Sequence, residues 1–173
     1  MRRRQYLAGA GAAALAGTAG CLGGLGLAGA GGGDRLAVVD TLDARGSSAG
    51  RQPLPVPETP TVVDLFATWC APCRAQMESL AAVHAEYGDR VAFVSVTNER
   101  FGGGLTADDV RAWWREHDGN WTLGHDPESD LMRALNAGGL PFTAVADAAG
   151  EVRSRHRGVV GVEALRADVE SVL

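Results

Sequence analysis

Lysine is absent from this chain of 173 residues, and all 16 of its basic residues are arginines. Acidic residues number 21, so the formal net charge is −5 at pH 7. Proteins that bind nucleic acid through its phosphates need a surface of positive charge. The charge balance therefore argues against nucleic acid as a partner.

Cysteine is scarce as well. Three cysteines occur: Cys70 and Cys73 share one Cys-Ala-Pro-Cys segment, and the third is Cys21. Three cysteines cannot build the disulfide framework of a small secreted domain. A zinc or iron–sulfur site would need further ligands at suitable spacing, and the four histidines are scattered. We therefore expect no metal ion and no cofactor.

The N-terminal apolar run is short. It covers residues 7–19, whereas a helix that spans a bilayer needs about 20 residues. It follows three arginines, which is the order of a secretory signal peptide. The segment Arg3-Arg4-Gln5-Tyr6-Leu7 resembles a twin-arginine export signal. We predict a signal peptide over residues 1–20, and an uncleaved N-terminal anchor is the alternative.

The end of this run predicts a lipid anchor. Thr18-Ala19-Gly20-Cys21 resembles a lipobox, although Thr18 stands where a leucine-type residue is commoner. We predict lipidation of Cys21, followed by a Gly-rich linker, so that residues 21–35 connect the lipid to the domain. A diacylglyceryl group supplies the two acyl chains that stable anchoring requires. The predicted location is the outer face of the cytoplasmic membrane.

The soluble part, residues 36–173, has the pattern of one α/β domain. Strands are expected where apolar and β-branched residues run together, and helices where apolar residues recur at helical spacing. The expected strands are residues 36–39, 61–67, 91–97, 142–146 and 151–155, with a loop over 45–60 that includes an extended piece at 54–56. The expected helices are residues 73–87, 106–117, 127–136 and 161–173.

The most specific signal lies in residues 63–74. Their sequence, Val-Asp-Leu-Phe-Ala-Thr-Trp-Cys-Ala-Pro-Cys-Arg, closely resembles the active-site segment of thioredoxins, in particular of extracytoplasmic thioredoxin-like reductases of the cytochrome-c-maturation type. Leu140-Pro141-Phe142-Thr143, about seventy residues further on, resembles the second signature of that family. The resemblance covers residues 36–173. It implies a thioredoxin fold, which is a central mixed β-sheet flanked by helices, here with an N-terminal extension.

Two cysteines carry the expected chemistry. Cys70 is expected at a helix N-terminus, where free backbone N–H groups and the macrodipole favour a thiolate, so it is the predicted attacking sulfur. Cys73, one turn into the helix, is expected to be more buried and to resolve the mixed disulfide from within the same molecule. Pro72 stiffens the bridge between them and lacks an N–H. Cys70 and Cys73 are thus the predicted redox-active disulfide.

Four further residues are expected to support the cysteines. The resemblance implies that Asp64, six residues before Cys70, is a buried acid that accepts the proton of the resolving thiol, because burial raises its pKa. An acid satisfied by local hydrogen bonds is the alternative. The resemblance also implies a cis Pro141 that faces the cysteines, with an ordinary trans turn proline as the alternative. Trp69 is expected to present an apolar face to partners, and Thr143 to support the site.

Other aromatic and imidazole side chains have simpler expected roles. Trp113, Trp114 and Trp121 are predicted to pack in or around the core rather than to form a binding patch. His84 is expected on a helix surface and His125 in a loop.

The resemblance implies a membrane-anchored thiol–disulfide oxidoreductase. It would take electrons from a membrane thiol carrier and reduce disulfides of exported proteins, with apocytochrome c as one candidate. Two alternatives stay open: a disulfide-forming oxidase or isomerase, and a copper-handling module of the same fold. The absence of histidine between the cysteines argues against a strong oxidant, and their two-residue spacing argues against copper. Nothing in the sequence demands more than a monomer.

Overall fold

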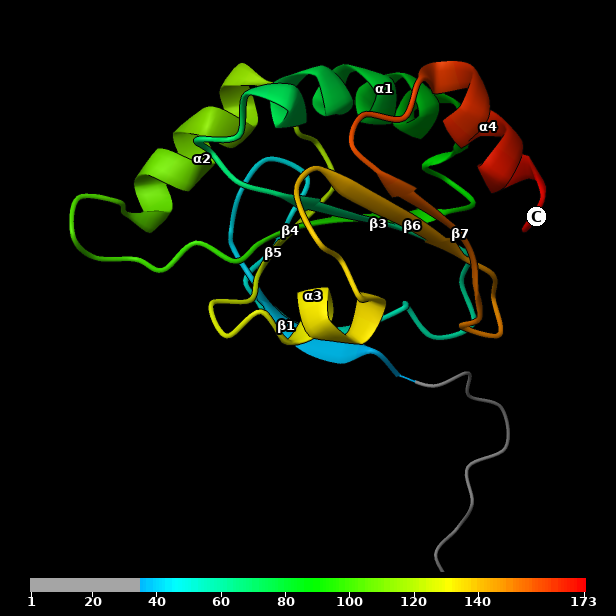
Figure 1. The fold of residues 1–173 in the computed structure, drawn as a ribbon, viewed down its shortest axis with the longest axis horizontal. Coiled ribbons are helices and arrows are strands. Elements are labelled where there is room, and N and C mark those ends of the chain that lie inside the picture. Colours follow the sequence, from blue (N-terminus) through cyan, green and yellow to red (C-terminus); the bar gives the residue numbers. More distant parts are fainter. Residues whose placement is uncertain (1–34) are drawn as a thin grey trace, which may run out of the picture.

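A seven-stranded sheet with helices on both faces forms the described part of this computed structural model, residues 35–173 (Figure 1). The strands are β1 (Ala37–Thr41), β2 (Gly50–Leu54), β3 (Thr61–Phe66), β4 (Ala92–Thr97), β5 (Thr122–His125), β6 (Phe142–Ala146) and β7 (Val152–Arg157). The helices are α1 (Ala71–Tyr87), α2 (Ala107–Glu116), α3 (Asp130–Leu135) and α4 (Val162–Glu170). The predicted signal peptide, the linker up to residue 34 and Cys21 lie outside the described residues.

The sheet is mixed, as the sequence predicted. Its strand order is β2-β1-β5-β4-β3-β6-β7. Strands β3, β4 and β5 run parallel, whereas β6 is antiparallel to β3, β7 to β6, and β1 to both β5 and β2. The central position of β3 and β4 explains why their apolar residues do not alternate with polar ones, because both faces of these strands are covered.

The two faces of the sheet carry different layers. Helices α1, α2 and α4 lie on one side of the sheet and α3 on the other (Figure 1). Alternate residues of β3 enter the two cores: Val62 and Phe66 belong to the cluster that contains the cysteines and the inner face of α1, whereas Val63 and Leu65 pack in the cluster that contains α3. Successive side chains of a strand point to opposite faces of the sheet, so the position of each residue in β3 determines which cluster it joins.

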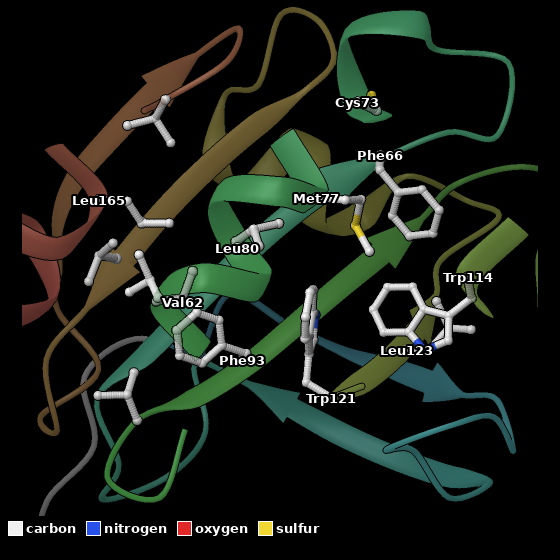
Figure 2. Close-up of a cluster of buried hydrophobic side chains, with 14 of the residues drawn as sticks. Val62, Phe66, Cys73, Met77, Leu80, Phe93, Trp114, Trp121, Leu123 and Leu165 are labelled. Carbon is white, nitrogen blue, oxygen red and sulfur yellow. The ribbon is translucent and has the colours of Figure 1, made fainter. Parts of the chain in front are cut away.

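The three buried tryptophans are core residues, as expected. Trp114 is fully buried, and Trp113 and Trp121 are nearly so. Figure 2 shows Trp121 between Phe93 and Trp114, whose rings lie 6.2 Å and 5.0 Å from it between centroids. The tryptophans therefore form part of the packing below α1 and α2.

Several element boundaries differ from those expected. Strand β5 was not among the expected strands. It is only four residues long and contains a glycine, and it is held by its pairing with β4 and β1. Strand β2 lies at Gly50–Leu54 rather than at residues 54–56. Because β2 is an edge strand, it tolerates Pro53, which has no backbone N–H to donate to a neighbouring strand.

Two helices also begin elsewhere than predicted. Helix α3 starts at Asp130 rather than at Pro127, after a turn in which the Asp126 carboxylate accepts a hydrogen bond from the Leu131 backbone N–H at 2.8 Å. Helix α1 starts at Ala71, two residues before its predicted first residue. The capping box predicted at Thr106 is present, with reciprocal bonds between Thr106 and Asp109.

Candidate active site

Cys70 and Cys73 form a disulfide at the start of α1. The chain leaves β3 at Phe66, and Cys70 occupies the N-cap position of the helix, as predicted. The two Cα atoms are 5.3 Å apart. Cys73 is 1 % exposed and Cys70 4 %, so the expected order of burial holds in the oxidised pair. Pro72 lies in the first turn of the helix, where its missing N–H leaves no helical bond unmade.

Asp64 is buried beneath this helix. It lies on β3 between Val62 and Phe66, which both pack in the cluster that contains Cys73, and is itself 2 % exposed. Its neighbours across the sheet are Ser95 on β4 and Thr143 on β6. Within residues 35–173, neither of its carboxylate oxygens has a hydrogen-bond partner of ordinary geometry. The Asp64 carboxylate therefore keeps unused capacity to accept hydrogen bonds.

Burial changes the acidity of this carboxyl. Loss of hydration raises the pKa of Asp64 from 3.8 to about 7, and the neighbouring Ser95 hydroxyl lowers it by a smaller amount. A carboxyl with a pKa near neutrality can take up and release a proton in the pH range where thiols are exchanged. Thr143, the neighbour on the other side, is also fully buried, and its hydroxyl lacks a partner among the described residues.

Pro141 lies beside the strand that leads to the cysteines. The Leu140–Pro141 peptide bond is cis, as the sequence predicted. Strand β6 pairs with β3 so that Leu65 faces Phe142, and continuing this register places Pro141 beside Phe66. The Pro141 carbonyl accepts a hydrogen bond from the Gly158 N–H at 2.9 Å. Pro141 is thus held between the active-site strand and the loop that precedes α4.

Apolar side chains are exposed directly before Cys70 and in the loop before α4. Trp69, which directly precedes Cys70, is 73 % exposed, in agreement with the apolar face predicted for it. Val159, in the loop held by Pro141, is 48 % exposed. Large exposed apolar side chains beside a buried redox pair are suited to contact a protein substrate.

Glu99, which no sequence pattern singled out, holds the active-site loop. Its carboxylate accepts hydrogen bonds from the Thr68 backbone N–H at 2.8 Å and the Thr68 hydroxyl at 2.7 Å. It also accepts one from the Thr97 hydroxyl at 3.0 Å. No local pattern could have identified it, because Thr68 and Glu99 are 31 residues apart.

Gln76 was also missed. Its side chain is 1 % exposed, and its Oε1 accepts a hydrogen bond at 2.8 Å from the backbone N–H of Val160, in the loop before α4. A signal for it did exist: Gln76 is a polar residue three positions after Cys73, next to the inward-facing Met77. A polar residue on the inner face of a helix usually has a specific partner.

Two histidines differ from expectation. His125 ends β5 instead of lying in a loop; its Nε2 lies 2.8 Å from the Glu99 carbonyl, and its ring stacks on Phe101. His84 is half-buried against Phe93 and Trp121 rather than free on the helix surface, and this burial lowers its pKa.

Neither a metal cluster nor a membrane span is found in the described part of the chain. Residues 35–173 contain no group of three or more His, Cys, Asp or Glu side chains arranged to hold a metal ion. No helix in this range is long and apolar enough to cross a bilayer.

Comparison with known proteins agrees with this geometry. The Redoxin family matches residues 54–173, which is more than half of the chain and includes every residue of the site described above. The chain belongs to the Redoxin family. The predicted membership of a thioredoxin-like family and the predicted thioredoxin fold are thereby confirmed.

Named relatives of this Redoxin chain are thiol–disulfide proteins. It is 25 % identical over 112 residues to the thiol-disulfide oxidoreductase ResA of Oceanobacillus iheyensis, covering 64 % of this chain and 56 % of ResA. It is 32 % identical over 120 residues to the thiol:disulfide interchange protein DsbE of Tatumella citrea, with the same two coverages. The chain thus spans about half the length of these relatives.

The fold also matches solved structures. A secreted Mycobacterium tuberculosis disulfide oxidoreductase homologous to E. coli DsbE superposes with a TM-score of 0.64 at 18 % identity, over 79 % of this chain and 96 % of that one. The chain therefore shares its fold with a solved disulfide oxidoreductase and carries the Cys70–Cys73 disulfide at the start of α1.

Proposed function

We propose that this Redoxin chain is an extracytoplasmic, membrane-anchored oxidoreductase that reduces disulfides of exported proteins through Cys70 and Cys73. The observation that carries the proposal is the redox pair at the N-terminus of α1 above a buried Asp64 whose pKa is about 7. The relatives named ResA and DsbE support the same chemistry. Apocytochrome c is one candidate substrate, because residues 66–73 resemble reductases of cytochrome-c maturation.

The first step is attack by Cys70. In the reduced enzyme its thiolate, favoured by the helix N-terminus, attacks one sulfur of a substrate disulfide. The substrate S–S bond breaks, a mixed disulfide forms with Cys70, and one substrate sulfur leaves as a thiolate. Trp69 and Val159 present the apolar surface on which the substrate chain lies, next to Pro141.

The second step uses Cys73 and Asp64. Asp64 takes the proton of the Cys73 thiol, and the Cys73 thiolate attacks the Cys70 sulfur. The mixed disulfide breaks, and the second substrate sulfur leaves as a thiolate that is then protonated. The Cys70–Cys73 disulfide is the oxidised product, and a membrane thiol carrier returns two electrons to it.

The reduction potential of the Cys70–Cys73 pair tests the direction of this reaction. The purified full chain would be equilibrated with defined thiol–disulfide buffers and its oxidised fraction measured. We expect a value near or below that of thioredoxin, about −270 mV. A potential of about −120 mV, that of a strong periplasmic oxidant, would contradict the reductase assignment and support disulfide formation instead.

The anchor needs a separate experiment. We propose export by residues 1–20 and lipidation at Cys21, which would leave the domain on the outer face of the cytoplasmic membrane. In cells, the full chain is expected in the membrane fraction and Cys21→Ala in the soluble extracytoplasmic fraction. Replacing Arg3 and Arg4 by lysine should block export altogether. A Cys21→Ala variant that stays with the membrane would instead support the uncleaved N-terminal anchor.

The copper alternative is tested on the reduced protein. Binding of copper ions by the Cys70–Cys73 dithiol would be followed by titration, with Cys70→Ser as the control. We expect no binding below micromolar concentration. Tighter binding that the control abolishes would favour the copper-handling module.

A further inference from the structure

A row of buried polar side chains crosses the sheet beneath α1. Thr143, Asp64 and Ser95 are direct neighbours on β6, β3 and β4, and all three are buried. Trp121, just before β5, extends the row: its indole N–H donates a hydrogen bond to the Ser95 hydroxyl oxygen at 2.9 Å. Residues 26 positions apart are thus joined inside the core.

The bond from Trp121 determines what Ser95 can do. A hydroxyl has one proton to donate and two lone pairs, and an indole N–H can only donate. Trp121 therefore occupies a lone pair of the Ser95 oxygen, and the hydroxyl proton stays available for an acceptor. The neighbour of Ser95 on β3 is Asp64, whose ionised carboxylate can only accept and whose two oxygens have no hydrogen-bond partner among the described residues.

We propose that Ser95, oriented by Trp121, is a positioning residue that donates its hydroxyl proton to the Asp64 carboxylate and so sets how readily Asp64 takes up a proton. The inference rests on the proposed function only for the role given to Asp64. A donor to a buried carboxylate stabilises its charged form, and such bonds are strong where water is excluded. The arrangement keeps Asp64 able to ionise near neutral pH, in agreement with the lowering effect of Ser95 on its pKa.

Other titratable groups near this row are few. His84 of α1 packs against Trp121 with ring centroids 5.1 Å apart, and its pKa is lowered by burial. From the same helix, Cys73 is held in the disulfide and Gln76 does not titrate. On the outer side, Trp121 borders a solvent-open pocket whose charged lining residues are Arg45, Glu86, Asp89 and Asp118.

The proposal can be tested first without any substitution. In the oxidised wild-type protein, NMR would follow the Asp64 carboxyl carbon and the Trp121 indole N–H between about pH 4 and pH 9, a range that brackets both ionisations. We expect the Trp121 signal to titrate with the midpoint of Asp64. The matched control is Trp114, whose indole N–H donates to the Arg45 carbonyl at 2.9 Å and should not follow Asp64.

Asp64→Asn separates the two nearby ionisations. It should remove the Trp121 transition at the Asp64 midpoint and leave any transition caused by His84. A Trp121 signal that never responds at the Asp64 midpoint, or that responds equally in Asp64→Asn, would overturn the proposal.

Variants of Ser95 then measure the size of the effect. Ser95→Ala should raise the Asp64 midpoint by at least about half a pH unit, a threefold change in the protonation equilibrium. Trp121→Phe should raise it less, and Ser95→Thr, which keeps the hydroxyl, should restore the wild-type midpoint. An unchanged midpoint in a folded Ser95→Ala variant would contradict the proposal. If that variant does not fold, the NMR titration of Asp64 and Trp121 in the wild-type protein still tests the proposal.

The pH profile of disulfide reduction distinguishes this inference from the proposed function. We expect the profile of Ser95→Ala to move to higher pH together with the Asp64 midpoint. If the midpoint moves and the profile does not, the positioning role of Ser95 stands and the proposed role of Asp64 in the reaction fails.

Discussion

The two faces of the central sheet are built from the same strands and differ in what they bury. On the α3 side, β3, β4 and β6 contribute apolar side chains: Val63, Leu65, Val94, Val96, Phe142 and Ala144. On the α1 side, the alternate positions include Asp64, Ser95 and Thr143. Both sides of these strands therefore serve packing, since Val62, Phe66 and Phe93 also pack on the α1 side, but that side buries polar groups of the strands as well.

Buried apolar groups and buried polar groups without a partner have opposite effects on stability. Full burial of a large apolar side chain stabilises a fold by about 1.5–3 kcal/mol. A buried polar group left without a partner costs about 1–3 kcal/mol. In the described chain, Asp64, Thr143 and Gln76 on the α1 side each have a side-chain polar atom without a partner. The α1 side therefore gives up some stability in the region that holds the reactive groups.

The largest expected effect is on the cysteines of the α1 side. Cys70→Ser should abolish disulfide reduction, because the thiol that remains in residues 35–173, Cys73, is the buried resolving cysteine. Cys73→Ser should accumulate a mixed disulfide between Cys70 and the substrate, detectable by mass spectrometry under non-reducing conditions. The matched change on the opposite face, Val63→Ala, should leave turnover measurable. Full turnover by Cys70→Ser would show that Cys70 is not the attacking thiol.

Asp64→Asn should stabilise the protein at high pH. The pKa of Asp64 is about 7 in the folded protein and about 3.8 in the unfolded chain, so the folded state retains a proton that the unfolded state has lost. The resulting stability is present in full below about pH 4, falls as pH rises and is lost above about pH 7. The asparagine amide does not titrate, so the advantage of the variant should grow by on the order of 4 kcal/mol between about pH 4 and pH 8. Urea unfolding of the oxidised wild-type and Asp64→Asn proteins at both pH values measures this change. A difference in unfolding free energy that is the same at both pH values would contradict the prediction.

Leu65→Ala tests the adjacent residue of β3, which faces α3. It should lower the free energy of unfolding by about 2–5 kcal/mol through lost burial and the cavity left behind. The loss should be the same at low and high pH, because no ionisable group is involved. The Asp64 midpoint, read by NMR, should stay at its wild-type value; a shifted midpoint would show that the two faces are not independent.

Gln76→Met should have the smallest effect on stability. It removes the bond to the Val160 N–H, but it also removes a buried amide nitrogen that has no partner in the described chain. These contributions oppose each other, so the unfolding free energy should change by less than about 1 kcal/mol. Because the loop before α4 loses an anchor, KM for a protein substrate should rise by less than about tenfold. Reduction of a small aromatic disulfide is the control and should be unchanged; a large loss of stability would show that Gln76 is a structural residue.

Much of the site could be predicted from local sequence. The step from β3 to α1 follows from a β-branched apolar run, a Cys-Ala-Pro-Cys segment and a helical repeat, all within residues 61–87. The cis Pro141 followed from the resemblance of a four-residue segment. Strand β5 could not be predicted, since four residues that include Gly124 have little strand propensity of their own and are held by β4 and β1.

The sequence by itself determined the redox pair, the helix that begins at it and the buried acid on the preceding strand, because these depend on residues close together in the chain. Only the tertiary structure decided that Thr68 is held by Glu99, that Val160 is held by Gln76 and that Ser95 accepts from Trp121. Each of these bonds joins residues at least 26 positions apart. The physical reason is that hydrogen-bond partners of buried groups are set by which strands and helices meet, and that is a property of the sheet order rather than of any local segment.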